Sequence, residues 1–177
     1  MCGHRRGRME GEDRARANEY AKVEARIDAL LANETDFVAA MATVACELHQ
    51  SFSHYHWTGF YRTLGSCGTL VIGPYQGTHG CLRIPKGKGV CGACALTKKT
   101  QLVPDVNEFP GHIACSSTTK SEIVVPLTNA SGEIVAVLDV DSNDYDAFHA
   151  DTDQASLERI CSKLTTTRVW KTGLAVL

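Results

Sequence analysis

The stretch from Gly80 to Leu127 constrains the fold more than any other part of the chain. It contains four of the eight cysteines and four of the five prolines, with frequent glycines between them. Because glycine and proline interrupt regular helices and strands, this stretch separates two groups of regular elements. Cysteines gathered in such an interrupted segment favour chemistry over core packing. The four are Cys81, Cys91, Cys94 and Cys115.

Composition limits what the rest of the chain can be. With 177 residues, 44% of them hydrophobic and 21% charged, it matches one ordinary globular domain. A formal net charge of -2 argues against nucleic acid as a partner, because binding phosphates requires a basic surface. No apolar run approaches the roughly 18 residues of a membrane span, and the N-terminus lacks the apolar core of a secretory signal. We therefore expect a cytoplasmic protein whose cysteines are buried small residues, metal ligands or redox-active thiols.

The two ends of the chain have different patterns. Residues 1–16 carry five arginines and three acids with almost nothing apolar, which predicts a disordered tail before one domain over residues 17–177. Apolar side chains at helical spacing predict two helices within residues 18–52. Asp151 and Gln154 resemble a capping box at the start of a final helix.

Strand-forming residues and a long loop define the rest of the fold. A loop of sixteen residues, Pro104–Thr119, has no periodicity, and loops of that length in compact domains are usually functional. The element order predicts an α+β fold with a central antiparallel sheet of about five to six strands. The N- and C-terminal helices pack on one face, and the looped crossover forms a pocket. The predicted strands are residues 56–64, 69–73, 100–103, 122–127 and 133–141.

Three carboxylates are predicted to lie close together. Asp139 and Asp141 are two residues apart in a strand, so their side chains leave the same face, and Glu122 opens the neighbouring strand. Mutual repulsion would raise at least one pKa toward neutrality. Such a cluster can bind an ammonium group, bind a metal or act as a general acid. The alternative is that the two aspartates simply end a strand at the solvent.

An aromatic face is predicted on the first strand. Trp57, Gly59 and Tyr61 share one side of it by period-two geometry. This face is either core or the wall of an apolar pocket.

The thiols allow two kinds of chemistry. Cys91 follows two glycines at the predicted start of a helix, where free backbone amides would lower its pKa. With Cys94 it forms a C-x-x-C motif, which fits a dithiol or half of a zinc site. A zinc site would need further ligands, for which His79, Cys81 and His112 are candidates.

Six collinear segments resemble the free methionine-(R)-sulfoxide reductase family, whose members are GAF-domain enzymes. The resemblance covers roughly residues 35–169 and keeps the three family cysteines at Cys81, Cys91 and Cys115. The segments are WTGFY (57–61), GPYQG (73–77), GCLRIPKGKGVCG (80–92), TQLVPDVNEFPGHIAC (100–115), SEIVVPL (121–127) and LDVDS (138–142).

The resemblance implies reduction of the R epimer of free L-methionine sulfoxide to methionine, with no bound cofactor and with electrons from thioredoxin. Cys115 resembles the thiolate that attacks the sulfoxide sulfur and becomes a sulfenic acid. Cys81 is similar to the resolving thiol that forms a disulfide with it. Cys91 matches the third family cysteine, which resolves or relays instead.

The resemblance also implies a substrate site. Its acids hold the substrate ammonium and protonate the leaving oxygen, its aromatic wall receives the methyl group, and backbone amides of the loop bind the carboxylate. Which acid has which task stays open. The implied positions are Trp57, Tyr61, Ile113, Ala114, Glu122, Asp139 and Asp141.

Cys94 departs from the family, which usually has a small residue without a thiol there. Two hypotheses follow: a Cys91–Cys94 disulfide that relays electrons to thioredoxin, or a small residue on a helix with no redox role.

Two other functions compete with the enzyme. A GAF sensor would bind a small ligand without catalysis, and a zinc-stabilised domain would bind a partner. A homodimer is expected by analogy with other GAF domains.

Overall fold

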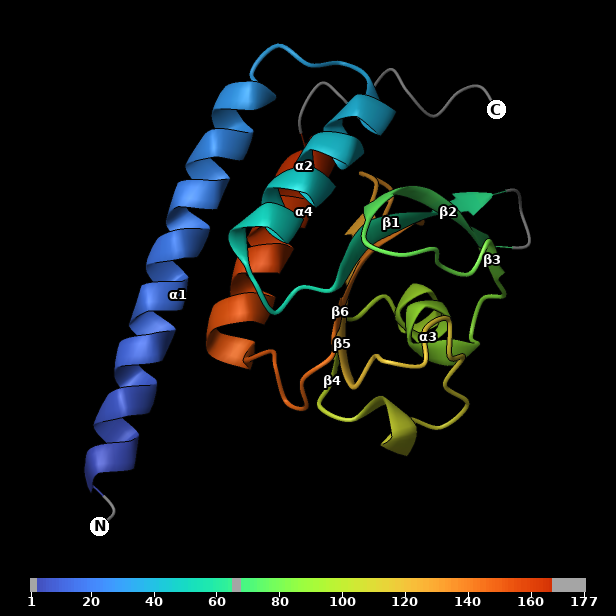
Figure 1. Cartoon of the computed structure of the whole chain (residues 1–177). Coiled ribbons are helices and arrows are strands. Elements are labelled where there is room, and N and C mark those ends of the chain that lie inside the picture. The colour runs from blue at the N-terminus through green and yellow to red at the C-terminus, as the bar shows by residue number, and fades with distance from the viewer. Residues whose placement is uncertain (1–2, 65–67, 167–177) are drawn as a thin grey trace.

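The computed structural model describes residues 3–64 and 68–166, so the end of the predicted domain, residues 167–177, lies outside the described residues. Helices begin and end the described chain, and six strands lie between them (Figure 1). In chain order the elements are α1 (Gly3–Leu30), α2 (Phe37–Ser51), β1 (Trp57–Leu64), β2 (Thr69–Gln76), β3 (Arg83–Ile84), α3 (Gly89–Thr97), β4 (Gln101–Val103), the 3-10 turn η1 (Val106–Glu108), β5 (Ser121–Thr128), β6 (Ile134–Ser142), the π-helical turn η2 (Ala150–Gln154) and α4 (Ala155–Thr166).

The strands form one antiparallel sheet in the order β3-β2-β1-β6-β5-β4. Helices α2 and α4 cover one face, α1 lies outside them, and α3 lies on the opposite face (Figure 1). The predicted α+β fold, with terminal helices on one face and a looped crossover on the other, is confirmed. The short strand β3 was not predicted, and the loop Pro104–Thr119 contains the turn η1.

Each face of the sheet has its own apolar core. The larger core joins α1, α2 and α4 to the sheet through side chains such as Met41, Phe60 and Leu157. The smaller core lies under α3 and includes Val90 and Val137. Because period-two alternation sends neighbouring residues of a strand to opposite faces, one strand such as β1 contributes to both cores.

The N-terminal segment differs from the predicted disordered tail. Helix α1 begins at Gly3, and Arg16 Nη1 donates hydrogen bonds to Asp153 Oδ2 at 2.7 Å and to the Ala147 carbonyl at 3.0 Å. His149 Nδ1 lies 2.9 Å from Asp13 Oδ1. These contacts join residues more than 130 positions apart, so composition alone cannot reveal them. Neither α1 nor any other described helix is both long and apolar enough to cross a membrane.

Asp153 is the buried anchor of this contact. Its side chain is 0% exposed and accepts hydrogen bonds from the Tyr20 hydroxyl and the His149 amide, both at 2.8 Å, besides the one from Arg16. The predicted capping box of Asp151 and Gln154 is wrong. The chain instead enters α4 through the π-helical turn η2, whose cap residue His149 makes no side-chain capping bond.

Replacing Asp153 by alanine should lower the free energy of unfolding by about 3 kcal/mol, because Arg16 and Tyr20 lose their buried partner. In a domain of this size that corresponds to a fall in Tm of roughly 6–12 °C. Urea and thermal unfolding measure it. Asp151→Ala, at an exposed position of the same turn, is the matched control and should change stability by no more than about 0.5 kcal/mol. Equal losses in both variants would contradict the anchoring role.

Candidate active site

The pairing of β1, β6 and β5 brings the predicted aromatic and acidic residues to one face. Trp57 pairs with Asp141 and Gly59 pairs with Asp139 across β1 and β6. On the other side of β6, Asp141 pairs with Glu122. Directly paired residues of an antiparallel sheet point to the same face, which here is the face covered by α3. The sheet therefore places three carboxyl groups beside the aromatic wall.

Burial changes the acidity of all three carboxyl groups. Loss of water raises the pKa of Asp139 to about 6. Burial, followed by the charges of Asp139 and Asp141, raises the pKa of Glu122 well above its usual range. Burial and Asp139 likewise raise the pKa of Asp141. The cluster can therefore hold protons near neutral pH and supply a general acid.

One carboxyl oxygen of the cluster has no hydrogen-bond partner among the described residues. Among the described residues, Asp139 Oδ1 is a buried atom without a hydrogen-bond partner. Asp139 also lines the pocket under α3. A buried acceptor without a partner is costly, so a ligand that donates a hydrogen bond would relieve that cost.

Trp57 forms the aromatic wall together with two tyrosines. Its ring stacks on Tyr61 at 5.7 Å between centroids and on Tyr75 at 5.3 Å, and its Nε1 donates a hydrogen bond to the Thr78 carbonyl at 2.9 Å. Gly59 makes the stacking possible, because a Cβ there would lie 2.4 Å from Tyr75 Cβ and 2.6 Å from the Trp57 ring. Trp57 and Tyr61 line the pocket. Tyr75 was not among the predicted site residues, although the matched segment GPYQG contains it.

Helix α3 places Cys91 against the carboxyl groups. Cys91 Sγ lies 3.9 Å from Glu122 Oε1. Burial, followed by the charges of Asp139 and Glu122, raises the pKa of the Cys91 thiol well above its usual value. The predicted lowering of this pKa by the helix N-terminus is therefore wrong. Desolvation and two nearby carboxylates outweigh the partial charge of a helix end.

Cys94 lies deeper in the same helix. Cys91 and Cys94 are both free thiols, so the predicted disulfide between them is not formed in this structure. Cys94 is 0% exposed, and its Sγ lies 3.5 Å from the Val124 carbonyl oxygen. A protein reductant cannot reach a thiol without accessible surface. This form of the protein therefore favours the alternative hypothesis, a small packed residue.

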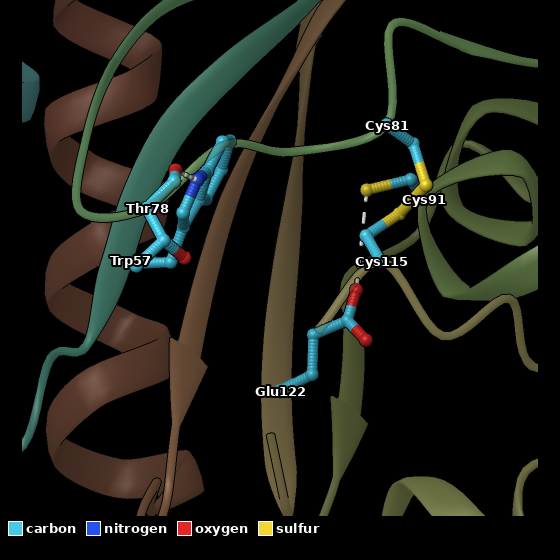
Figure 2. Close-up of a disulfide and its surroundings, with 6 residues drawn as sticks. All are labelled: Trp57, Thr78, Cys81, Cys91, Cys115 and Glu122. Atoms are coloured by element: carbon cyan, nitrogen blue, oxygen red, sulfur yellow. Dashed lines mark hydrogen bonds between the residues drawn. A yellow bond between two sulfur atoms is a disulfide. The ribbon is translucent and has the colours of Figure 1, made fainter. Parts of the chain in front are cut away.

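A disulfide joins Cys81 to Cys115, with 5.3 Å between their Cα atoms. It connects the segment before β3 to the long loop Pro104–Thr119. Figure 2 shows the bridge beside the Cys91 sulfur, with the Glu122 carboxyl pointing toward them and Trp57 on the opposite side. Cys115 lines the pocket, whereas Cys81 is not among its lining residues.

The pocket between these groups is small in the disulfide form. Its volume of about 30 Å³ leaves room for about two water molecules, which is too little for an amino acid. Ile113 lines it, whereas Ala114 is exposed outside the lining. Loop residues Ser116 and Thr119 also line it and carried no recognisable motif in the sequence. The predicted site residues in the lining are Trp57, Tyr61, Cys91, Ile113, Cys115, Glu122, Asp139 and Asp141.

The candidate zinc ligands are not brought together. Cys81 is bound to Cys115 and Cys94 faces the Val124 carbonyl, while His79 and His112 line the pocket. A different set of donor atoms, from Cys91, Glu122 and Asp139, lies within 4.8 Å. With a thiol and a glutamic acid of raised pKa, this set would have to lose protons before binding a cation.

The six-stranded sheet with its pocket under α3 defines a GAF domain, and the GAF domain family matches residues 32–166. Free methionine-R-sulfoxide reductase of Escherichia coli (strain K12) is 40% identical over 145 residues, covering 82% of this chain and 86% of that protein. The reductase of Saccharomyces cerevisiae is 48% identical over 117 residues, covering 66% of this chain but only 64% of that protein. The Neisseria meningitidis reductase in complex with its substrate has a TM-score of 0.79 at 41% identity, covering 85% of this chain and 87% of that chain. The chain belongs to the free methionine-R-sulfoxide reductase family.

Replacing Asp139 by asparagine should stabilise the protein at neutral pH but not in acid. The folded pKa of about 6 exceeds the ordinary value of 3.8, so the ionised carboxylate costs stability as pH rises through 6, and no such cost exists below about pH 4. Asn removes this ionisation. The free energy of unfolding should rise by about 2 kcal/mol at pH 7.5, with little gain at pH 4.

Chemical unfolding at both pH values measures this difference. Asp144→Asn, which removes an exposed carboxylate, is the control and should show no such pH dependence. If Asp139→Asn raised the free energy of unfolding equally at both pH values, burial of the Asp139 charge would not be the cause of the increase.

Proposed function

We propose that this protein reduces free L-methionine-(R)-sulfoxide to L-methionine by thiol chemistry in the pocket under α3. The observation that carries the proposal is the Cys81–Cys115 bridge, which borders a pocket lined by carboxyl groups of raised pKa and by an aromatic wall. The named relatives in yeast and E. coli support the substrate. The electrons come from a thioredoxin-type dithiol, and no bound cofactor takes part.

In the proposed reaction, the Cys115 thiolate attacks the sulfoxide sulfur. The attack forms a bond between Cys115 Sγ and the substrate sulfur while the sulfoxide oxygen takes a proton. The oxygen then passes to Cys115 Sγ as its bond to the substrate sulfur and the new sulfur–sulfur bond both break, which leaves methionine and a Cys115 sulfenic acid. The Cys81 thiol then attacks the sulfenic sulfur, releases water and closes the Cys81–Cys115 disulfide. A dithiol reductant supplies two electrons and two protons to reopen it. The net reaction converts one sulfoxide and one dithiol to methionine, water and a disulfide.

We assign proton donation to Glu122. Burial, followed by the charges of Asp139 and Asp141, raises its pKa well above its usual range and so favours its protonated form, and its carboxyl points toward the sulfur atoms (Figure 2). Asp139 and Asp141 are assigned to the substrate ammonium, because Asp139 Oδ1 lacks a partner among the described residues. The division places Glu122 near the reacting sulfur, while Asp141 pairs with Trp57 across β1 and β6.

The rest of the substrate fits the remaining surfaces. The stacked faces of Trp57 and Tyr61 receive the methyl group and favour the partial positive charge on the sulfur. Backbone amides around Ile113 and Ala114 bind the substrate carboxylate. Because the disulfide form holds only about two waters, the loop with Cys115 must move before the substrate binds. Reduction of the bridge removes the covalent restraint on that loop.

Cys91 is assigned a reserve role in this scheme. Its buried thiol lies beside the bridge and next to Glu122 (Figure 2). It can replace Cys81 as the resolving thiol only after losing its proton, against a raised pKa. The proposal places the reaction in the cytoplasm, where thioredoxin-type dithiols are reduced, and includes a homodimer by analogy with other GAF domains.

Three cysteine variants test the proposal. Cys115→Ser should form no methionine, because the nucleophile is gone. Cys81→Ser should form about one methionine per chain and then stop, because the sulfenic acid has no resolving thiol. Cys94→Ala is the matched control and should keep wild-type turnover, since its thiol is fully buried and outside the pocket lining. Methionine release measures the single turnover. NADPH consumption with thioredoxin and thioredoxin reductase measures sustained turnover.

The outcomes separate the alternatives. No methionine from the reduced wild-type protein would overturn the proposed reaction and leave a ligand-binding GAF domain. Sustained turnover by Cys81→Ser that is lost in Cys81→Ser/Cys91→Ser would make Cys91 the resolving thiol.

A further inference from the structure

The two sulfur atoms of the disulfide have different surroundings, one at the pocket and one outside its lining. Cys115 lines the pocket, whereas Cys81 does not, and both residues are half-buried. A thiolate attacks a disulfide in line with the sulfur–sulfur bond, from the side opposite the leaving sulfur. Cys115 borders the pocket, which has room for only about two waters, so a protein thiolate cannot approach it through the pocket. Attack on Cys81 comes from the side away from the pocket residue Cys115.

An exposed apolar side chain lies next to Cys81. Leu82 is 73% exposed, the largest exposed fraction of any large hydrophobic side chain among the described residues. Ile113, two residues before Cys115, is also exposed at its outer edge and rests over Gly89. Single exposed apolar residues are common and need no explanation. Here, however, they flank the two halves of one redox-active bond.

The segment of the chain that carries Leu82 is also basic. The segment 78–99 contains five lysines and arginines and no aspartate or glutamate, although the whole chain is slightly acidic. Arg83, Lys86 and Lys88 are all exposed. A local positive surface on a chain of net charge -2 attracts an acidic partner and raises its rate of association.

We infer that this Cys81 surface, formed by Leu82, Arg83, Lys86 and Lys88, binds the protein dithiol that reduces the disulfide, and that this partner has an acidic rim around an apolar contact. The inference rests on the proposed function and specifies which sulfur meets the reductant. Leu82 supplies the apolar contact, and the three cations orient the partner.

The exchange balances in two steps. The thiolate of the reductant attacks Cys81 Sγ and forms a mixed disulfide, while Cys115 leaves with the electron pair and takes a proton. The second thiol of the reductant then attacks its own sulfur in the mixed disulfide. Cys81 leaves as a thiol, and the reductant departs with an internal disulfide, oxidised by two electrons. Cys115 is thereby regenerated on the pocket side, where the next sulfoxide binds.

Leu82→Ser tests the apolar contact. With an acidic thioredoxin as the probe, its KM should rise roughly fivefold, because loss of an interface anchor costs about 1 kcal/mol. Turnover with the small reductant dithiothreitol should not change, because a small dithiol needs no docking surface. Leu30→Ser is the matched control: Leu30 is 58% exposed at the end of α1 and should change neither value. Fluorescence or scattering measurements of oligomeric size show whether Leu82 instead binds a second copy of the chain.

Charge reversal tests the cations. The double variant Arg83→Glu/Lys86→Glu should raise the KM for the acidic thioredoxin about tenfold at low salt, and the difference should shrink toward 0.5 M salt as charges are screened. Arg14→Glu, an exposed arginine on α1, is the control for net charge. A difference that does not depend on salt would contradict the electrostatic part of the inference.

A trapping experiment identifies the sulfur that is attacked. Thioredoxin without its second thiol should form a mixed disulfide with Cys81, which peptide mass spectrometry locates. A mixed disulfide at Cys115, or unchanged thioredoxin kinetics in Leu82→Ser, would overturn this inference while dithiothreitol-driven methionine formation upheld the reductase. Absence of methionine with every reductant would instead overturn the proposed function.

Discussion

The double pairing of Asp141 determines the geometry of the site. On β6 it lies between Trp57 of β1 and Glu122 of β5, and two residues earlier in the strand Asp139 lies between Gly59 and Val124. A slip of one residue in either ladder would send these side chains to the opposite face, into the core under α2 and α4. The register therefore places Trp57, Asp141 and Glu122 side by side across the three strands. The buried apolar residues on both faces of the sheet stabilise that register.

The same arrangement makes the site energetically unfavourable. Three carboxyl groups and a thiol share a buried space, where loss of water raises their pKa values. An oxygen of Asp139 lacks a partner among the described residues. The larger core on the other face and the contact between Asp153 and α1 stabilise the fold. The α3 face therefore does not need to supply this part of the stability. The two faces of the sheet thus have separate tasks, and the acids can be placed for chemistry without determining whether the chain folds.

Sequence patterns were sufficient where a local period or a long motif carried the information. Period-two alternation placed Asp139 with Asp141 and Trp57 with Tyr61, and the matched segments placed the three cysteines. They failed where contacts between distant residues decide the outcome. The polar composition of residues 1–16 predicted disorder, yet Arg16 pairs with Asp153 across 137 positions. A helix N-terminus predicted an acidic Cys91, yet carboxyl groups on β5 and β6 reverse the direction of its pKa. Neither partner is visible in a local window.

The bridge between Cys81 and Cys115 separates two environments that the proposed cycle must visit in turn. One sulfur borders a small pocket lined by carboxyl groups, and the other lies next to an exposed leucine in a segment with exposed cations. A single thiol could not serve both, because the pocket excludes a protein and the outer surface offers no acid to protonate a sulfoxide oxygen. In the proposed cycle two thiols solve this problem, since oxidation of Cys115 at the pocket is converted into a disulfide whose other sulfur, on Cys81, is the one attacked by the reductant. Cys81 and Cys115 are 34 residues apart in the sequence, so the two tasks fall on separate segments, one beside β3 and the other in the long loop.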